Sequence, residues 1–159
     1  MRVFVMGLAI VALIAAVGIA VAEGPRNYRA HLSGPEGIAT LGQGEAIFQF
    51  SADGQTLSYR LIVANIEDVT MAHIHVAAAP GQAGPPAVWL YPPQPPAQLI
   101  PGRSQGPLGV GTATAANLVG PIMSGKTLAD LRQAIEEGRA YVNVHTLAYP
   151  AGEINGVIR

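Results

Sequence analysis

The chain has 159 residues, of which 9 are Lys or Arg, 10 are Asp or Glu and none is Cys. Residues 23–159 carry 8 basic and 10 acidic groups, a net charge of −2, and Lys126 is the only lysine. Neutralising several phosphates requires clustered Lys and Arg, so the composition excludes a basic nucleic-acid-binding surface. The lack of cysteine excludes a disulfide framework and thiol chemistry, which leaves core burial to stabilise a single domain.

Residues 1–22 have the pattern of an export signal. Arg2 supplies the positive start, residues 3–20 supply the apolar stretch, and Ala20-Val21-Ala22 is a small-x-small cleavage site before Glu23. The same stretch is also just long enough to be an uncleaved membrane anchor. Both alternatives predict an exported protein that is secreted, periplasmic or on the cell surface, with the membrane contacted only through this segment.

The rest of the chain predicts short strands separated by turns. The whole sequence contains 19 Gly and 13 Pro, and its β-branched and aromatic runs are short. The Asp53-Gly54 pair favours a hairpin turn. We therefore expect an all-β fold, an antiparallel sandwich or barrel, with strands near residues 28–33, 46–51, 57–64, 70–76, 87–91, 110–115, 139–146 and 153–159.

One short helix is expected among these strands. Thr127 is a suitable N-cap, Asp130 occupies the capping-box position and Gly138 follows as a C-terminal stop. Apolar residues at helical spacing predict a core-facing stripe formed by Leu128, Leu131 and Ile135. Two Pro- and Gly-rich stretches, residues 80–86 and 92–106, are expected to be surface loops, because proline cannot donate to the ladder of an inner strand.

Three of the four histidines fall in two predicted strands, TMAHIHVA and AYVNVHT. Because side chains alternate along a strand, His73 and His75 share one face, and both rings can converge on one ion. His145 becomes a third ligand if the two strands are neighbours. Glu153 lies beyond a tight turn from His145 and is the candidate fourth ligand, with water as the alternative. Three imidazoles and a carboxylate suit zinc or copper.

A structural role is the alternative for the same residues. A histidine on a half-buried strand can donate one ring proton to a main-chain carbonyl and do nothing else, and Glu153 can pair with turn amides or an arginine. The protein would then be a metal-free extracellular interaction domain, whose Pro-rich loops and Trp89 contact a protein partner. A metal site instead predicts ring nitrogens of His73, His75 and His145 within about 3 to 4 Å of one another.

Motifs of the common enzyme classes are missing from the sequence. There is no Gly-x-Ser-x-Gly elbow, no phosphate-binding loop and no dinucleotide fingerprint. If the metal were catalytic, it would need an open coordination position. The residues therefore name no catalytic group and favour a binding module, with enzyme activity left open.

Two segments resemble the CHRD domain, which is named after chordin and also occurs in exported bacterial proteins. They are FSADGQTLSYRLIVANIEDVTMAHIH and LADLRQAIEEGRAYVNVHTLAYPAGEINGVI, and the resemblance covers residues 28–159. It implies an extracellular binding module in which certain positions recur: His73, His75, Asn143, His145, Gly152 and Glu153. Asn155 departs from the pattern, since the family commonly has Arg after Glu-Ile.

Overall fold

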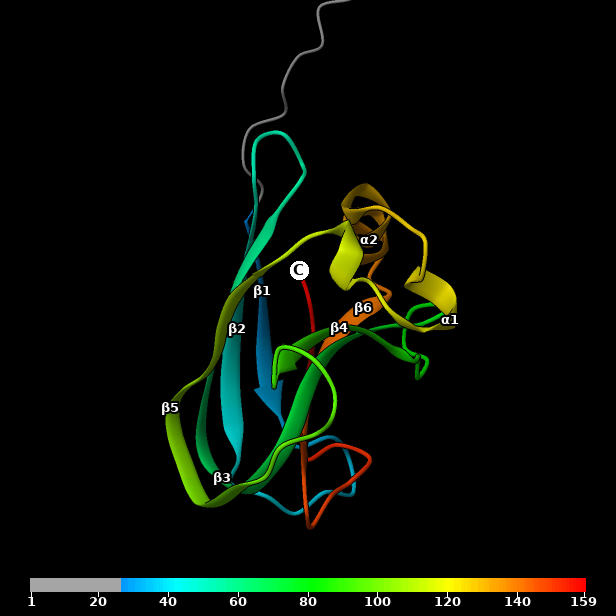
Figure 1. The fold of residues 1–159 in the computed structure, drawn as a ribbon. Helices are drawn as coiled ribbons and strands as arrows, with labels where there is room; N and C mark the ends of the chain where they lie inside the picture. The colour runs from blue at the N-terminus through cyan, green and yellow to red at the C-terminus, as the bar shows by residue number, and fades with distance from the viewer. Residues whose placement is uncertain (1–26) are drawn as a thin grey trace, which may run out of the picture.

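The computed structural model describes residues 27–159, so the expected signal segment, residues 1–22, lies outside the described residues. The described chain is mostly β, which confirms the predicted fold class (Figure 1). Its strands are β1 (Asn27–Ser33), β2 (Gln43–Phe50), β3 (Leu57–Val76), β4 (Pro86–Tyr91), β5 (Ile100–Ala113), β6 (Ala140–Thr146) and β7 (Ile154–Val157). Its helices are η1 (Ala115–Asn117), α1 (Gly120–Met123) and α2 (Leu128–Glu136). Within residues 27–159, every helix is too short or too polar to cross a membrane.

The antiparallel strands close into a barrel around β3. The first part of β3 pairs with β2 and β5, and its last part pairs with β6 and β4. The β6–β7, β7–β1 and β1–β2 pairs complete the ring. Two main-chain hydrogen bonds between Arg29 and Arg159, of 2.7 and 2.8 Å, continue the closure past β7.

The two strands predicted over residues 57–64 and 70–76 are one bent strand. At the bend, Asn65 and Asp68 have φ angles of 55° and 50°, and the register with β5 shifts between residues 63 and 69. Short polar side chains such as Asn and Asp tolerate this left-handed conformation better than other non-glycine residues. The bend lets one strand belong to two parts of the barrel wall.

The prediction of a surface loop over residues 92–106 is wrong for the second half of that stretch. β5 begins at Ile100 and continues through Pro101 to Ala113. In the described sheet β5 hydrogen-bonds only to β3, so it is an edge strand. Proline is tolerated there because no second neighbour requires its missing N–H.

Apolar side chains fill the barrel and the space under the helices. Leu61, Ile74 and Ile154 are fully buried, and the predicted stripe of α2 packs against the same core. Thr127 and Asp130 form the predicted capping box at the start of α2. The helix thus begins where the sequence predicted, and its buried face is held by the hydrophobic effect.

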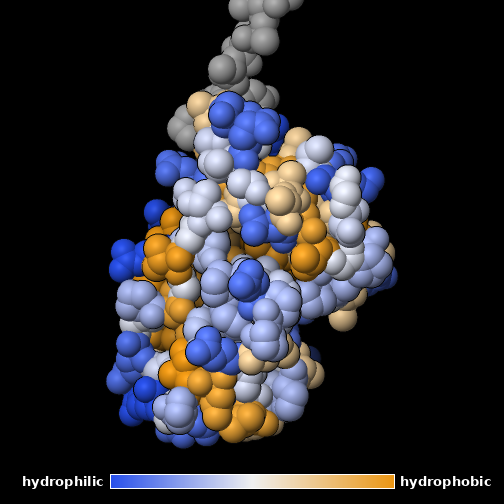
Figure 2. Space-filling view, viewed as in Figure 1, coloured by the Kyte–Doolittle hydropathy of each residue, from blue (hydrophilic) through white to orange (hydrophobic). Residues whose placement is uncertain are grey.

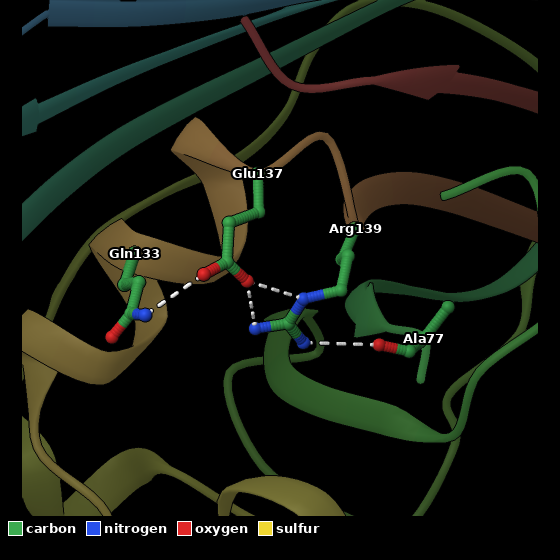
Figure 3. A network of polar contacts seen from close by, with 4 residues as sticks. All are labelled: Ala77, Gln133, Glu137 and Arg139. Carbon is green, nitrogen blue, oxygen red and sulfur yellow. Dashed lines mark hydrogen bonds and ion pairs between the residues drawn. The ribbon is translucent and has the colours of Figure 1, made fainter. Parts of the chain in front are cut away.

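A polar network joins the end of α2 to the end of β3 (Figure 3). The Nε2 of Gln133 donates to Oε1 of Glu137 at 2.8 Å, and Arg139 donates to Oε2 of Glu137 through Nε and Nη2, both at 2.6 Å. The Nη1 of Arg139 donates to the Ala77 carbonyl at 3.1 Å, and the Ala77 N–H donates to the Arg139 carbonyl at 2.9 Å. These contacts fix where the segment after β3 leaves the sheet.

Candidate metal centre

Strands β3 and β6 bring three histidines to one face of the sheet. Their register pairs His73 with Asn143, which leaves His145 diagonal to His73, two residues further along β6 and on the same face as Asn143. His75 follows His73 on the same face of β3. The alternate residues of this part of β3 are buried in the apolar core, so the strand presents core on one side and imidazoles on the other.

The three imidazoles form a compact group. One ring nitrogen from each lies within 4.8 Å of the others. The closest described contact joins Nδ1 of His73 to Nε2 of His145 at 3.3 Å. Nitrogens bound to one ion at about 2.0–2.1 Å lie about 3.3–3.6 Å apart, so one pair already has ligand spacing.

Two main-chain carbonyls set the protonation of two of these rings. The Nδ1 of His75 contacts the Gly84 carbonyl at 2.8 Å, and the Nδ1 of His145 contacts the Pro150 carbonyl at 2.9 Å. Because a carbonyl oxygen only accepts, both Nδ1 atoms must carry the proton and donate. The Nε2 atoms therefore keep free lone pairs, which is the form of imidazole that binds a metal ion.

Two nitrogens of the group are buried without a partner. The Nε2 atoms of His73 and His75 have no hydrogen-bond partner among residues 27–159. Leaving one buried polar atom unsatisfied costs about 1–3 kcal/mol. Two such atoms in one cluster are unusual in a native protein, and each needs a physical explanation. A cation bound through Nδ1 of His73 and the Nε2 atoms of His75 and His145 would satisfy one of the two, the Nε2 of His75.

Burial also keeps the three histidines neutral. The residues are 2% (His73), 6% (His75) and 5% (His145) exposed. Desolvation, with smaller effects from His145 and His75, lowers the pKa of His73 to about 3. Desolvation also lowers the pKa values of His75 and His145, against the hydrogen bonds to Gly84 and Pro150, which raise them. At neutral pH a bound ion would not compete with protons for these nitrogens.

Aromatic rings cover the group. The Trp89 indole meets the His73 ring edge to face, with centroids 4.2 Å apart, and the Tyr141 ring stacks on His75 at 5.1 Å. The Tyr141 hydroxyl accepts from the Gly84 N–H at 3.0 Å and donates to the Gly84 carbonyl at 3.3 Å. Gly84 thus ties the segment after β3 to two residues of the site, and these contacts hold the rings in place.

The structure does not bring Glu153 into the histidine group. Its carboxylate accepts hydrogen bonds from Oγ1 of Thr40 at 2.6 Å and from Oγ1 of Thr146 at 2.8 Å. Adjacent residues of a strand point to opposite faces, so Thr146 draws this carboxylate to the side away from His145. Glu153 is buried, and its contacts fasten the turn between β6 and β7 to the β1–β2 connection.

Asn143 and Gly152 shape the same turn. The Nδ2 of Asn143 donates to the Ala151 carbonyl at 3.0 Å, while its Oδ1 is buried with no partner among residues 27–159. Gly152 has a φ of 122°, and a Cβ there would lie 2.1 Å from Oδ1 of Asn143. Only glycine lets the amide lie this close, and the Pro150 carbonyl reaches His145 from this turn.

Sequence reasoning did not identify the groups that surround the histidines. Strand alternation alone puts Tyr141 on the same face as His145, four residues away, and this spacing is the one sequence signal for its contact with the site. The contact between Trp89 and His73 depends on the pairing of β3 with β4, which no side-chain pattern specifies. The carbonyls of Gly84 and Pro150 belong to the main chain, which is the same for every residue type, so the sequence does not predict their contacts with the histidines.

Fold and site together define a closed antiparallel β-barrel domain with a buried three-histidine cluster on its outer sheet face. Comparison with protein families matches residues 28–158 to the CHRD domain. The chain therefore belongs to the CHRD domain family, which confirms the assignment made from its motifs. Comparisons with curated proteins and with solved structures gave no match.

Proposed function

We propose that this protein is an exported CHRD-domain binding module that holds one transition-metal ion, copper or zinc, through His73, His75 and His145. The observation that carries the proposal is the convergence of three neutral imidazoles, one nitrogen of each lying within 4.8 Å of the others, together with the buried and unpaired Nε2 of His75. Imidazole nitrogen is a preferred ligand of both metals. Export is supported by the signal pattern of residues 1–22 and by the extracellular setting that the family resemblance implies.

The hydrogen bonds to Gly84 and Pro150 favour a second candidate function, a metal-free extracellular interaction domain. In that case His75 and His145 fasten two covering segments, and the ligand is a protein. Large exposed apolar residues come from different strands and loops, and hydrophobic areas alternate with polar ones on the face in Figure 2. This candidate accounts for the Nδ1 atoms of His75 and His145 but leaves the buried Nε2 of His75, which a metal ion would satisfy, without a partner among residues 27–159.

Elemental analysis separates the two candidates. The full chain is purified without a polyhistidine tag, together with a His73→Ala/His145→Ala double variant. His31→Ala is the matched control, because His31 is a largely exposed histidine whose described charge contact is with Glu45 at 3.6 Å. We expect near-stoichiometric copper or zinc in the wild type and in the control, and none in the folded double variant.

The contrary result is equally defined. A wild-type protein without bound metal, whose thermal stability does not change when copper or zinc is added, would overturn the metal proposal. The search would then turn to protein partners.

A further inference from the structure

We infer that the three-histidine site selects a monovalent ion, so that it holds Cu(I) in preference to Zn²⁺ or Cu²⁺. This inference rests on the metal binding proposed above and adds the identity of the ion. It is carried by the charge and burial of the groups around the three rings.

The available ligands carry no negative charge. Among residues 27–159, the group that can hold a metal consists of three histidines and no carboxylate, and the chain has no cysteine to supply a thiolate. The carboxylate of Glu153 is held by Thr40 and Thr146 on the other side of β6. An ion bound by these imidazoles would therefore keep its whole charge.

The groups behind the ligands are neutral too. The Nδ1–H groups of His75 and His145 donate hydrogen bonds to main-chain carbonyls. In many zinc sites a carboxylate accepts this hydrogen bond from the ligating histidine instead. Asn143, opposite His73 on the neighbouring strand, is an amide. Trp89 and Tyr141 add aromatic surface without charge. Among residues 27–159, these described neighbours of the rings thus carry no negative charge that would neutralise a dication.

Because the site is buried, its lack of negative charge favours a monovalent ion over a divalent one. The three residues are almost fully buried, and a surface depression over β6 is lined by Tyr141 and Asn143 but by none of the three histidines. The cost of moving an ion from water into such a place rises with the square of its charge, so it is about four times larger for a dication than for a monocation. Three nitrogen ligands satisfy Cu(I), which accepts low coordination numbers, whereas Zn²⁺ almost always takes a fourth ligand.

The test measures the affinities of the full-length wild type for the three ions. Cu(I) is titrated without oxygen against a colorimetric chelator, and Zn²⁺ and Cu²⁺ are titrated against chelators of known affinity. We expect Cu(I) to bind more tightly than either dication. Loss of binding in the His73→Ala/His145→Ala variant shows that the ion occupies this site.

A charge placed beside the rings tests the cause. Asn143→Asp adds one negative charge with little change in shape, and the ratio of Zn²⁺ to Cu(I) affinity should rise by on the order of tenfold or more. Asn155→Asp is the matched control, because Asn155 pairs with Asn143 from β7 and is half-buried. Its charge lies one strand further away and is better screened, so its effect should be smaller.

A second pair of variants protects the test against misfolding, since Asn143→Asp also removes the donor to the Ala151 carbonyl. Met71 is half-buried, lies opposite His145 and is on the face of His73. Met71→Glu should raise the ratio of Zn²⁺ to Cu(I) affinity relative to Met71→Gln, which has nearly the same shape without the charge.

The outcomes distinguish this inference from the proposed function. The selectivity is overturned if Zn²⁺ or Cu²⁺ binds in a histidine-dependent way at least as tightly as Cu(I). It is also overturned if the added charges do not change the ratio of Zn²⁺ to Cu(I) affinity. In both cases the proposal of a metal site at the three histidines stands. Binding of none of the three ions overturns the proposed metal function and the selectivity with it.

Discussion

The two ends of β3 belong to one strand but differ in what covers them. From Leu57 to Val63 buried residues alternate with more exposed ones, and Ser58 and Arg60 face water. From Ala72 to Val76 every residue is buried. The first end has the core on one side and solvent on the other. The second end has the core on one side and, on the other, the imidazoles under the segments that carry Gly84 and Pro150.

This difference shows that the polar positions of a strand become a buried site only where other segments cover them. The alternation of polar and apolar residues alone does not create such a site. Apolar and polar residues alternate at both ends of the strand. At the covered end the polar positions are histidines, which can stay neutral and can donate a hydrogen bond to a carbonyl of a covering segment. An arginine at the same place would bring a permanent charge into a buried environment, at a high cost in free energy.

The largest effect should come from the core side of the covered end. Ile74→Ala removes a fully buried side chain and should lower the free energy of unfolding by about 2–5 kcal/mol. The histidines face the other way, so the folded variant should keep its metal. Urea unfolding with a chelator present and elemental analysis of the folded variant test the two statements. Loss of metal from a folded variant would show that the two faces are coupled.

A smaller loss is expected where the cover meets the strand. A Cβ at Gly84 would lie 2.1 Å from the Val76 carbonyl oxygen, so Gly84→Ala must push the covering segment away from His75. Overpacking of this kind costs about 1–3 kcal/mol, and the metal affinity should fall as well. Ala83→Ser, at an exposed neighbouring residue, is the control and should change stability by less than about 0.5 kcal/mol. Equal results for both variants would mean that the contact at Gly84 does not hold the cover.

Acid should destabilise the metal-free protein through the same histidines. Their pKa values lie below the ordinary 6.5 in the folded state, so below pH 6.5 the unfolded chain binds more protons. Stability should be fully present above pH 6.5 and should fall as the pH is lowered, down to about 3 for His73. The slope is at most about 1.4 kcal/mol per pH unit for each histidine.

Urea unfolding at pH 7, 6 and 5 in the presence of a chelator measures this slope above the range in which most carboxylates titrate. His73→Gln removes one titrating group and should make the slope shallower. A wild-type stability that stays constant between pH 7 and pH 5 would contradict the burial of neutral histidines.

The smallest effect should come from the solvent side of the uncovered end. Arg60→Gln changes an exposed residue of β3 and should alter the free energy of unfolding by no more than about 0.5 kcal/mol. Metal content should be unchanged. A loss above 1 kcal/mol in urea unfolding would show that this end also has a cover that matters.

The sequence predicted most strands and the face of the sheet on which the histidines lie. It did not predict which groups surround the histidines. Alternation placed His73 with His75, and the CHRD motif pointed to His145, because both signals lie in side chains. Glu153 follows His145 across a tight turn, yet its direction depends on hydrogen bonds from Thr40 and Thr146, which are tertiary contacts. The start of β5 at Ile100 was missed because edge strands accept the proline that inner strands reject.

The closure of the barrel between Arg29 and Arg159 has a consequence for how the domain is made. A ribosome releases the chain from its N-terminus, so β1 and β2 can pair early, while the second edge of β1 waits for β7 and Arg159. An open strand edge is a template for aggregation. Chaperones that hold the nascent chain would therefore have to act until β7 and Arg159 have been synthesised, because their pairing with β1, and not formation of the first hairpin, closes the barrel.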